Sequence, residues 1–287
     1  MDQGVAKVNV TQESPQTGNP PEERSINPFL ASLWAETLKI RRSRVPLFTA
    51  IGFSLMPLAG GLFMIILKDP EAARSMGLIS AKAQLMVGVA DWPAYFNFMS
   101  QAVAAGGLIL FSIVTTWVFG REFSDHTAKE MLALPTSREA IVTAKFIVTS
   151  VWAMAVTLLI FGLSLAVGTL IVLPGWSTVL LRSAFVGILG CAFFTLGLIP
   201  FVALLASIGR GYLPPFGWTI LTMVLAQFAA ILGWGDWFPW AIPGLFSGVA
   251  GPRAEALGTH SYVLLLLTSI AGFAATYYWW RSADQTR

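Results

Sequence analysis

Long uninterrupted apolar runs constrain this chain more than any other feature. A helix needs roughly 20 apolar residues to cross the hydrocarbon core of a bilayer, and six runs approach or exceed that length. Charged residues make up only 11% of the 287 residues, whereas soluble domains carry about 25%. The sequence therefore predicts an all-α polytopic membrane protein with a membrane domain over residues 46–281. The six expected spans are residues 46–67, 98–119, 146–173, 183–208, 213–232 and 261–280.

The lysines and arginines of the loops predict the direction of these spans. If the N-terminus is inside, eleven of them flank the spans on the inner side and five on the outer side. Cytoplasmic loops of membrane proteins carry the excess of positive charge. Both termini are therefore expected in the cytoplasm, including the short C-terminal segment 282–287.

Two different segments precede the first span. Residues 1–26 are rich in Pro, Gln, Glu and Ser, which predicts a disordered cytoplasmic tail. In residues 27–45, Asn27 suits a helix N-cap and Pro28 suits the first helical position. An apolar stripe at helical spacing follows, formed by Leu30, Leu33, Trp34 and Leu38. This pattern predicts an amphipathic helix on the inner membrane surface; a simple basic anchor that fixes the topology is the alternative.

The segment before the last span, residues 233–260, has too many glycines and prolines for a spanning helix. It is also too aromatic for a solvated loop. Backbone at membrane depth must have its polar groups satisfied, so short half-helices that re-enter the membrane from the outer face are expected. An aromatic belt at the outer interface is the alternative.

Several familiar chemistries lack support in the sequence. There is no Gly-x-x-x-x-Gly-Lys-Ser/Thr phosphate loop and no His-Glu-x-x-His zinc pair. The interiors of the expected spans contain no Asp, Glu, Lys or Arg, which disfavours proton coupling through buried carboxylates. We therefore expect no catalytic residue, no metal and no cofactor in this chain. The polar residues within the spans are uncharged, and helix packing is favoured over a substrate path as their role.

A charged, helix-prone segment, residues 121–138, separates the second and third spans. It carries both signs of charge and has a proline, Pro135, shortly before Arg138. A turn between two spans needs only a few polar residues. The length and charge of this segment therefore indicate a surface that another protein binds, with a solvated loop as the alternative.

This segment resembles the corresponding loop of ABC-2 type transporter permeases. In that family the second and third helices are joined by Glu-aromatic, then Thr, Leu, Pro-x-x-Arg and Ala/Ser-Lys. The matching residues here are Glu122-Phe123, Thr127, Leu132, Pro135, Arg138 and Ala144-Lys145. The motif covers about a tenth of the chain, and the expected layout of spans around it agrees. The aromatic and proline-rich run 238–243 is similar to the corresponding run of the bacitracin and lantibiotic export permeases.

The resemblance implies that residues 121–138 form a coupling helix. This helix would dock on a separate ATP-binding cassette subunit, which would bind ATP and Mg²⁺. The amphipathic helix would be a second contact. The residues expected to couple the two subunits are Glu122, Phe123, Thr127, Lys129, Glu130, Met131, Leu132, Pro135, Arg138 and Lys145.

The resemblance also implies a dimer of permeases, because six spans do not readily enclose a path for a bulky solute. Whether the partner is a second copy or a paralogue stays open. A path at the dimer interface makes Gln101, Thr115, Thr222 and Gln227 the candidate lining residues.

The function expected on this basis is outward transport of an amphipathic peptide antibiotic or drug across the inner (cytoplasmic) membrane. Two alternatives are kept. One is an ABC-2 permease that transports a lipid or glycan, and the other is a membrane enzyme or anchor protein. Membrane lipid is an expected partner, and nucleic acid is not.

Overall fold

The computed structural model describes residues 27–69, 89–125, 127, 136–248 and 257–282, and all regular structure among them is helical. After α1 (Pro28–Arg42), six helices are long and apolar enough to cross a membrane. These confirm the six predicted spans, and the chain is a multi-pass membrane protein. They are α2 (Val45–Lys68), α5 (Trp92–Ser124), α7 (Arg138–Leu170), α8 (Thr178–Ile208), α9 (Leu213–Ile231) and α11 (Thr259–Ser282).

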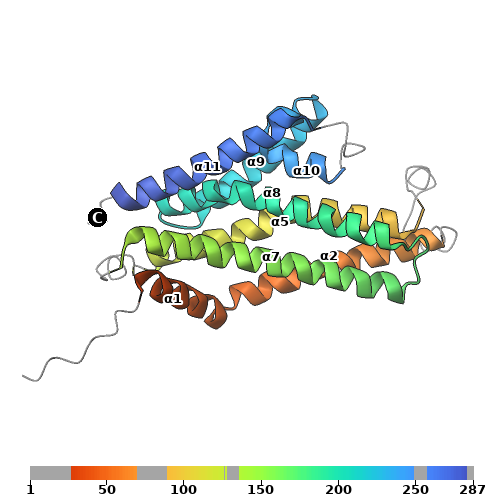
Figure 1. Ribbon diagram of the computed structural model, residues 1–287, viewed down its shortest axis with the longest axis horizontal. Coiled ribbons are helices and arrows are strands. Elements are labelled where there is room, and N and C mark those ends of the chain that lie inside the picture. Colours follow the sequence, from red (N-terminus) through yellow and green to blue (C-terminus); the bar gives the residue numbers. More distant parts are fainter. Residues whose placement is uncertain (1–26, 70–88, 126, 128–135, 249–256, 283–287) are drawn as a thin grey trace, which may run out of the picture.

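The helices α5 and α8 form the centre of the bundle (Figure 1). Helices α1, α2 and α7 lie on one side of this pair, whereas α9, α10 (Ile242–Phe246) and α11 lie on the other (Figure 1). The end of the bundle that holds α1, the end of α5, the start of α7 and the end of α11 is called the α1 end. The opposite end is called the far end.

Helices α5 and α7 begin well before the positions that the hydropathy predicted. The second and third spans were expected over 98–119 and 146–173, but α5 and α7 each contain 33 residues. A capping side chain sets the first residue of each helix. Asp91 accepts a hydrogen bond from the backbone N–H of Ala94 at 2.8 Å, and Ser137 accepts one from Ala140 at 3.2 Å. Hydropathy reports only the apolar part of a helix, whereas caps satisfy the free N–H groups where the helix begins.

At its C-terminal end, α7 is shorter than the predicted third span. The helix ends at Leu170, three residues earlier than expected. Here the Lys68 ammonium donates hydrogen bonds to the carbonyls of Ile171 (2.6 Å) and Val172 (2.9 Å). A cation from α2 therefore satisfies carbonyl groups that the end of α7 leaves free.

Close helix packing depends on small residues. Gly168 of α7 lies against the buried ring of Trp92, and a Cβ atom at this position would overlap that ring. In contrast, a Cβ atom on Gly162 of the same helix would meet nothing within 4 Å. The contact between the start of α5 and the end of α7 therefore requires glycine at position 168.

The predicted re-entrant segment contains three short helical pieces. They are η1 (Gly235–Trp237), η2 (Pro239–Ala241) and α10, and residues 249–256 of the segment lie outside the described residues. Ile242 is completely buried in the packing of α10 against α8 and α5. The entry of this segment into the membrane stays a prediction.

Candidate functional site: a buried charge cluster at the α1 end

Helix α1 begins as the sequence predicts. Asn27 accepts a hydrogen bond from the backbone N–H of Phe29 at 3.0 Å, and Pro28 is the first helical residue. The apolar residues Leu30 and Trp34 are 57% and 69% exposed and point away from the bundle. The opposite face of α1 packs on α7 and buries Ser32, Glu36 and Ile40.

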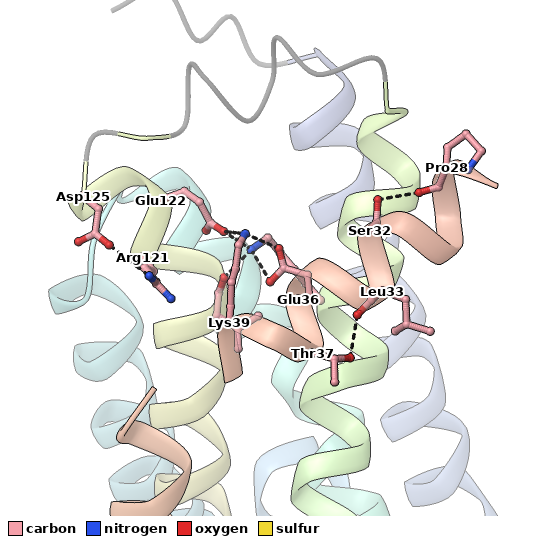
Figure 2. A network of polar contacts seen from close by, with 11 residues as sticks. Pro28, Ser32, Leu33, Glu36, Thr37, Lys39, Arg121, Glu122 and Asp125 are labelled. Carbon is pink, nitrogen blue, oxygen red and sulfur yellow. Dashed lines mark hydrogen bonds and ion pairs between the residues drawn. The ribbon is translucent and has the colours of Figure 1, made fainter. Parts of the chain in front are cut away.

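This packing brings four charged side chains together. Glu36 and Lys39 come from α1, Glu122 from the last turn of α5, and Lys145 from the third turn of α7. Figure 2 shows Glu36 and Lys39 of α1 pointing toward Glu122. We call Glu36, Lys39, Glu122 and Lys145 the charge cluster.

Lys145 is the most buried member of the charge cluster, with no exposed side-chain surface. Its ammonium nitrogen lies 2.7 Å from Glu122 Oε1 and 3.3 Å from Glu36 Oε2, and it donates to the carbonyl of Val118 at 2.7 Å. An ammonium has three donors, so these three acceptors use all of them. A buried charge needs this degree of pairing to offset the loss of hydration.

Lys39 links the same carboxylates from the solvent side. Its ammonium nitrogen lies 2.7 Å from Glu36 Oε1 and 2.9 Å from Glu122 Oε1. Burial alone would lower the pKa of Lys39. The carboxylates of Glu122 and Glu36 outweigh this effect and raise the pKa above its ordinary value of 10.5. Two ammonium groups and two carboxylates therefore hold α1, α5 and α7 together.

A groove of about 500 Å³ opens beside the charge cluster. It is bounded by α1, the end of α5 and the start of α7, with Glu122 in its wall. Glu122 Oε2 is buried and has no hydrogen-bond partner in the part of the chain that the structure describes. The other polar side chains in the groove are Ser32, Glu36, Lys39, Arg121, Asp125, Thr127 and Thr136.

The structure divides the predicted coupling residues into groups. Glu122 and Lys145 join the charge cluster, and Thr127 lines the groove. Phe123 is buried and packs edge-on against Trp279 and Trp280 of α11, with ring centroids 5.8 and 5.9 Å apart. The residues that lie outside the described part of the chain are Lys129, Glu130, Met131, Leu132 and Pro135.

Arg138 also contacts α11. It donates hydrogen bonds to the carbonyls of Trp280 at 3.1 Å and Arg281 at 3.3 Å. A cation therefore lies at the C-terminal end of α11, where the helix dipole favours positive charge. The segment that joins α5 to α7 is thus tied to the last spanning helix at both of its ends.

Sequence reasoning did not assign Glu36 and Lys39 to the site. One signal was available, because Glu36 and Lys39 are three residues apart and therefore neighbours on a helix. This pair lies on the face of α1 opposite its exposed apolar residues. The partners across the interface, Glu122 and Lys145, are 83 or more residues away in the chain from Lys39 and Glu36, so no local pattern indicates them.

The four candidate path residues do not converge on one site. Thr115 is buried and donates to the carbonyl of Phe111 at 2.7 Å, within its own helix. Thr222 likewise donates to Trp218 at 2.9 Å. Of the four, only Gln227 lines the cavity of about 60 Å³ between α5, α9 and the short helices. Gln101 lies half-buried on α5.

The described part of the chain thus has six helices that are long and apolar enough to span a membrane, preceded by α1 and its buried charge cluster. The sequence model of the ABC-2 family transporter protein matches residues 32–228. Because this match covers more than half of the chain, the chain belongs to the ABC-2 transporter family. Membership implies association with an ATP-binding subunit. The predicted resemblance is therefore confirmed.

A curated relative supports the same branch of the family. The chain is 28% identical over 182 residues to the bacitracin transport permease protein BCRB of Bacillus licheniformis. The aligned region covers 62% of this chain and 85% of that protein. No solved structure matches the chain.

Proposed function

We propose that this chain is the permease subunit of an ABC-2 exporter that moves an amphipathic peptide antibiotic or drug outward. A separate subunit would bind and hydrolyse ATP. The observation that carries this proposal is the charge cluster, which ties α1 to α5 and α7, the two helices that residues 121–138 connect in the sequence. A partner that binds this segment would therefore act on three helices together.

Helix length supports transmission of movement from this end. Helices α5 and α7 contain 33 residues each, so each is about 50 Å long. A displacement of their ends at the charge cluster changes the position of the whole helix, because a continuous helix moves as one body. Through Lys145 and Glu122 the same displacement reaches α1, and through Arg138 it reaches α11.

The proposed cargo and the proposed assembly are each drawn from one further observation. The relative is named as a bacitracin transport permease, which favours an amphipathic peptide. Only 17% of the apolar window of α9 is buried in the chain. This leaves a large apolar face for a second permease, either another copy or a paralogue, and a path between the two subunits would then include Gln227.

The proposed direction of transport requires a defined topology. The α1 end would face the cytoplasm in the inner membrane, with both termini cytoplasmic. An epitope tag at residue 75 or 255 should then be accessible from outside intact cells, and a tag at residue 128 only after permeabilisation. The opposite labelling pattern would refute this topology.

Copurification tests the proposed partner. The tagged chain is purified in mild detergent from its own membranes, and an ATP-binding cassette subunit is expected to copurify. Glu122→Lys and Arg138→Glu should lower the amount of this subunit or uncouple its ATPase activity from transport. Lys82→Glu, a charge reversal in the segment between α2 and α5 that is predicted to lie outside, serves as the matched control and should preserve association and coupling.

Membrane insertion and size-exclusion profiles of all variants establish that they fold. If the wild-type chain retains no ATP-binding subunit, the proposed function is wrong. If Glu122→Lys and Arg138→Glu bind the subunit and transport like the wild type, the proposed coupling role of residues 121–138 is wrong.

A further inference from the structure

A second groove lies toward the far end of the bundle, away from the charge cluster. Its volume is about 370 Å³, and it lies between the first turns of α8 and the short helix α10. Val179, Val186 and Phe246 form apolar walls. Arg182 and Ser183 contribute the polar groups. The groove therefore combines a cation, a hydroxyl and apolar walls.

The aromatic wall of this groove is held in place by its neighbours. The ring of Phe246 packs edge-on against Phe194, with centroids 4.9 Å apart. It also lies over Gly190 of α8, where a Cβ atom would be 2.7 Å from the ring. Because the wall is already ordered, a ligand that enters the groove loses little affinity to ordering of the protein.

Arg182 is the charged group of the groove, and it is exposed. Within the described ranges, no acidic side chain forms an ion pair with it. This differs from Lys39 and Lys145 at the α1 end, which are both paired with carboxylates. None of the described acidic side chains neutralises Arg182, and its guanidinium is exposed to negatively charged ligands from the surroundings of the protein.

The position of Arg182 along α8 indicates what those surroundings are. It is the fifth residue of a helix that is capped by Ser177 and long enough to span the membrane. At 1.5 Å per residue, Arg182 is about 6 Å along the axis from the first helical residue. A long basic side chain at this depth can extend to the headgroup layer while its stem stays in apolar surroundings. On the same face, Val179 and Val186 are 79% and 59% exposed.

We propose that this groove binds an anionic phospholipid of the surrounding bilayer, such as phosphatidylglycerol. The planar guanidinium of Arg182 matches the geometry of two phosphate oxygens, and the Ser183 hydroxyl can donate a further hydrogen bond. One acyl chain lies along Val179, Val186 and Phe246. Phosphatidylglycerol is favoured over phosphatidylcholine because its headgroup has no cation to oppose Arg182.

A lipid in this position contacts both α8 and α10. It therefore adds a non-covalent connection between a central helix and the segment that precedes α11. We expect bound phosphatidylglycerol to stabilise this part of the bundle against thermal unfolding. The site is independent of the charge cluster and of the ATP-binding subunit, so its test does not depend on the proposed function.

Lipid titration of the purified full-length chain tests this proposal. The wild type, Arg182→Gln and Arg281→Gln are delipidated in detergent and titrated with phosphatidylglycerol or phosphatidylcholine. Native mass spectrometry counts the bound lipids, and thermal unfolding gives the shift in Tm. The Arg281→Gln variant is the matched control, since it removes an exposed arginine from the α1 end.

The wild type is expected to retain at least one phosphatidylglycerol more firmly than phosphatidylcholine, with a higher Tm. This preference should be lost in Arg182→Gln and kept in Arg281→Gln. A second variant, Val186→Trp, keeps the charge but fills the groove, and it should also lose the bound lipid. The proposal is overturned if Arg182→Gln and Val186→Trp both retain the wild-type preference, or if the wild type has none.

Discussion

The ammonium nitrogen of Lys145 in α7 lies 2.7 Å from Oε1 of Glu122 in α5, and the Lys145 side chain is completely buried. The same ammonium reaches Glu36 of α1 at 3.3 Å. A buried ion pair is weak evidence for stability, because desolvation opposes the attraction between the charges. Its clearer consequence is geometric, since three helices must keep one relative position for these groups to remain paired.

Removal of Lys145 should destabilise the bundle strongly. In Lys145→Met, Glu122 and Glu36 remain buried with one fewer cation, and the free energy of unfolding should fall by about 3–5 kcal/mol. Unfolding in mixed detergent micelles measures the change. As a control, Arg121→Gln removes a largely exposed pair with Asp125 and should cost at most about 1 kcal/mol. Equal effects of the two substitutions would contradict the structural role of Lys145.

Glu36 should hold α1 against α7. Ser32 lies on the buried face of α1, so a cysteine at this position should react slowly with a maleimide. Adding Glu36→Gln should increase the labelling rate several-fold because α1 then leaves α7 more often. A cysteine in place of Leu30, which is 57% exposed, should label rapidly in both backgrounds. The buried Cys191 is replaced by Ala throughout. An unchanged rate at position 32 would show that Glu36 does not hold α1.

The contribution of Lys39 should persist until strongly alkaline pH. The neighbouring carboxylates raise its pKa above 10.5, so its stabilisation is fully present below the unfolded pKa and is lost as the pH rises through the higher folded pKa. Because the side chain is 33% exposed, solvent screening limits its contribution to about 1 kcal/mol. The difference in unfolding free energy between wild type and Lys39→Gln should be constant from about pH 7 to 9. A marked decrease within this range would contradict the expected direction of the pKa shift.

Two glycines of α7 should respond oppositely to alanine. Gly168→Ala places a methyl group against the Trp92 ring, and overpacking of this kind costs about 1–3 kcal/mol. Gly162→Ala meets no neighbour, and the higher helix propensity of alanine should make it neutral or stabilising by up to about 1 kcal/mol. Thermal unfolding of the two variants provides the comparison. A similar loss in both would mean that the contact with Trp92 does not limit the packing.

Gln227 and Thr115 should differ in their effect on export, if the proposed function is right. Gln227 lines a cavity, whereas the Thr115 hydroxyl is bonded within its own helix. Gln227→Leu should therefore change resistance to an exported peptide antibiotic several-fold, and Thr115→Val should leave it close to wild type. Resistance is measured in cells at matched membrane levels of each variant. A large effect confined to Thr115→Val would contradict this assignment.

The sequence by itself determined the class of protein and the approximate positions of its helices. The six spans follow from hydropathy because the transfer free energy of each apolar side chain depends mainly on that side chain. The start of α1 was also predictable, since Asn27 and Pro28 act on the backbone within one turn. The family was recognisable from the short charged motif that begins at Glu122.

Only the tertiary structure decided which polar residues meet. Lys145 and Glu36 are 109 residues apart in the chain, and Arg138 and Trp280 are 142 residues apart. Their contacts depend on how whole helices pack, and this in turn depends on many side chains of several elements at once. Hydropathy, capping and motif spacing act locally along the chain. They therefore place each residue on its helix but do not specify the helix that it will face.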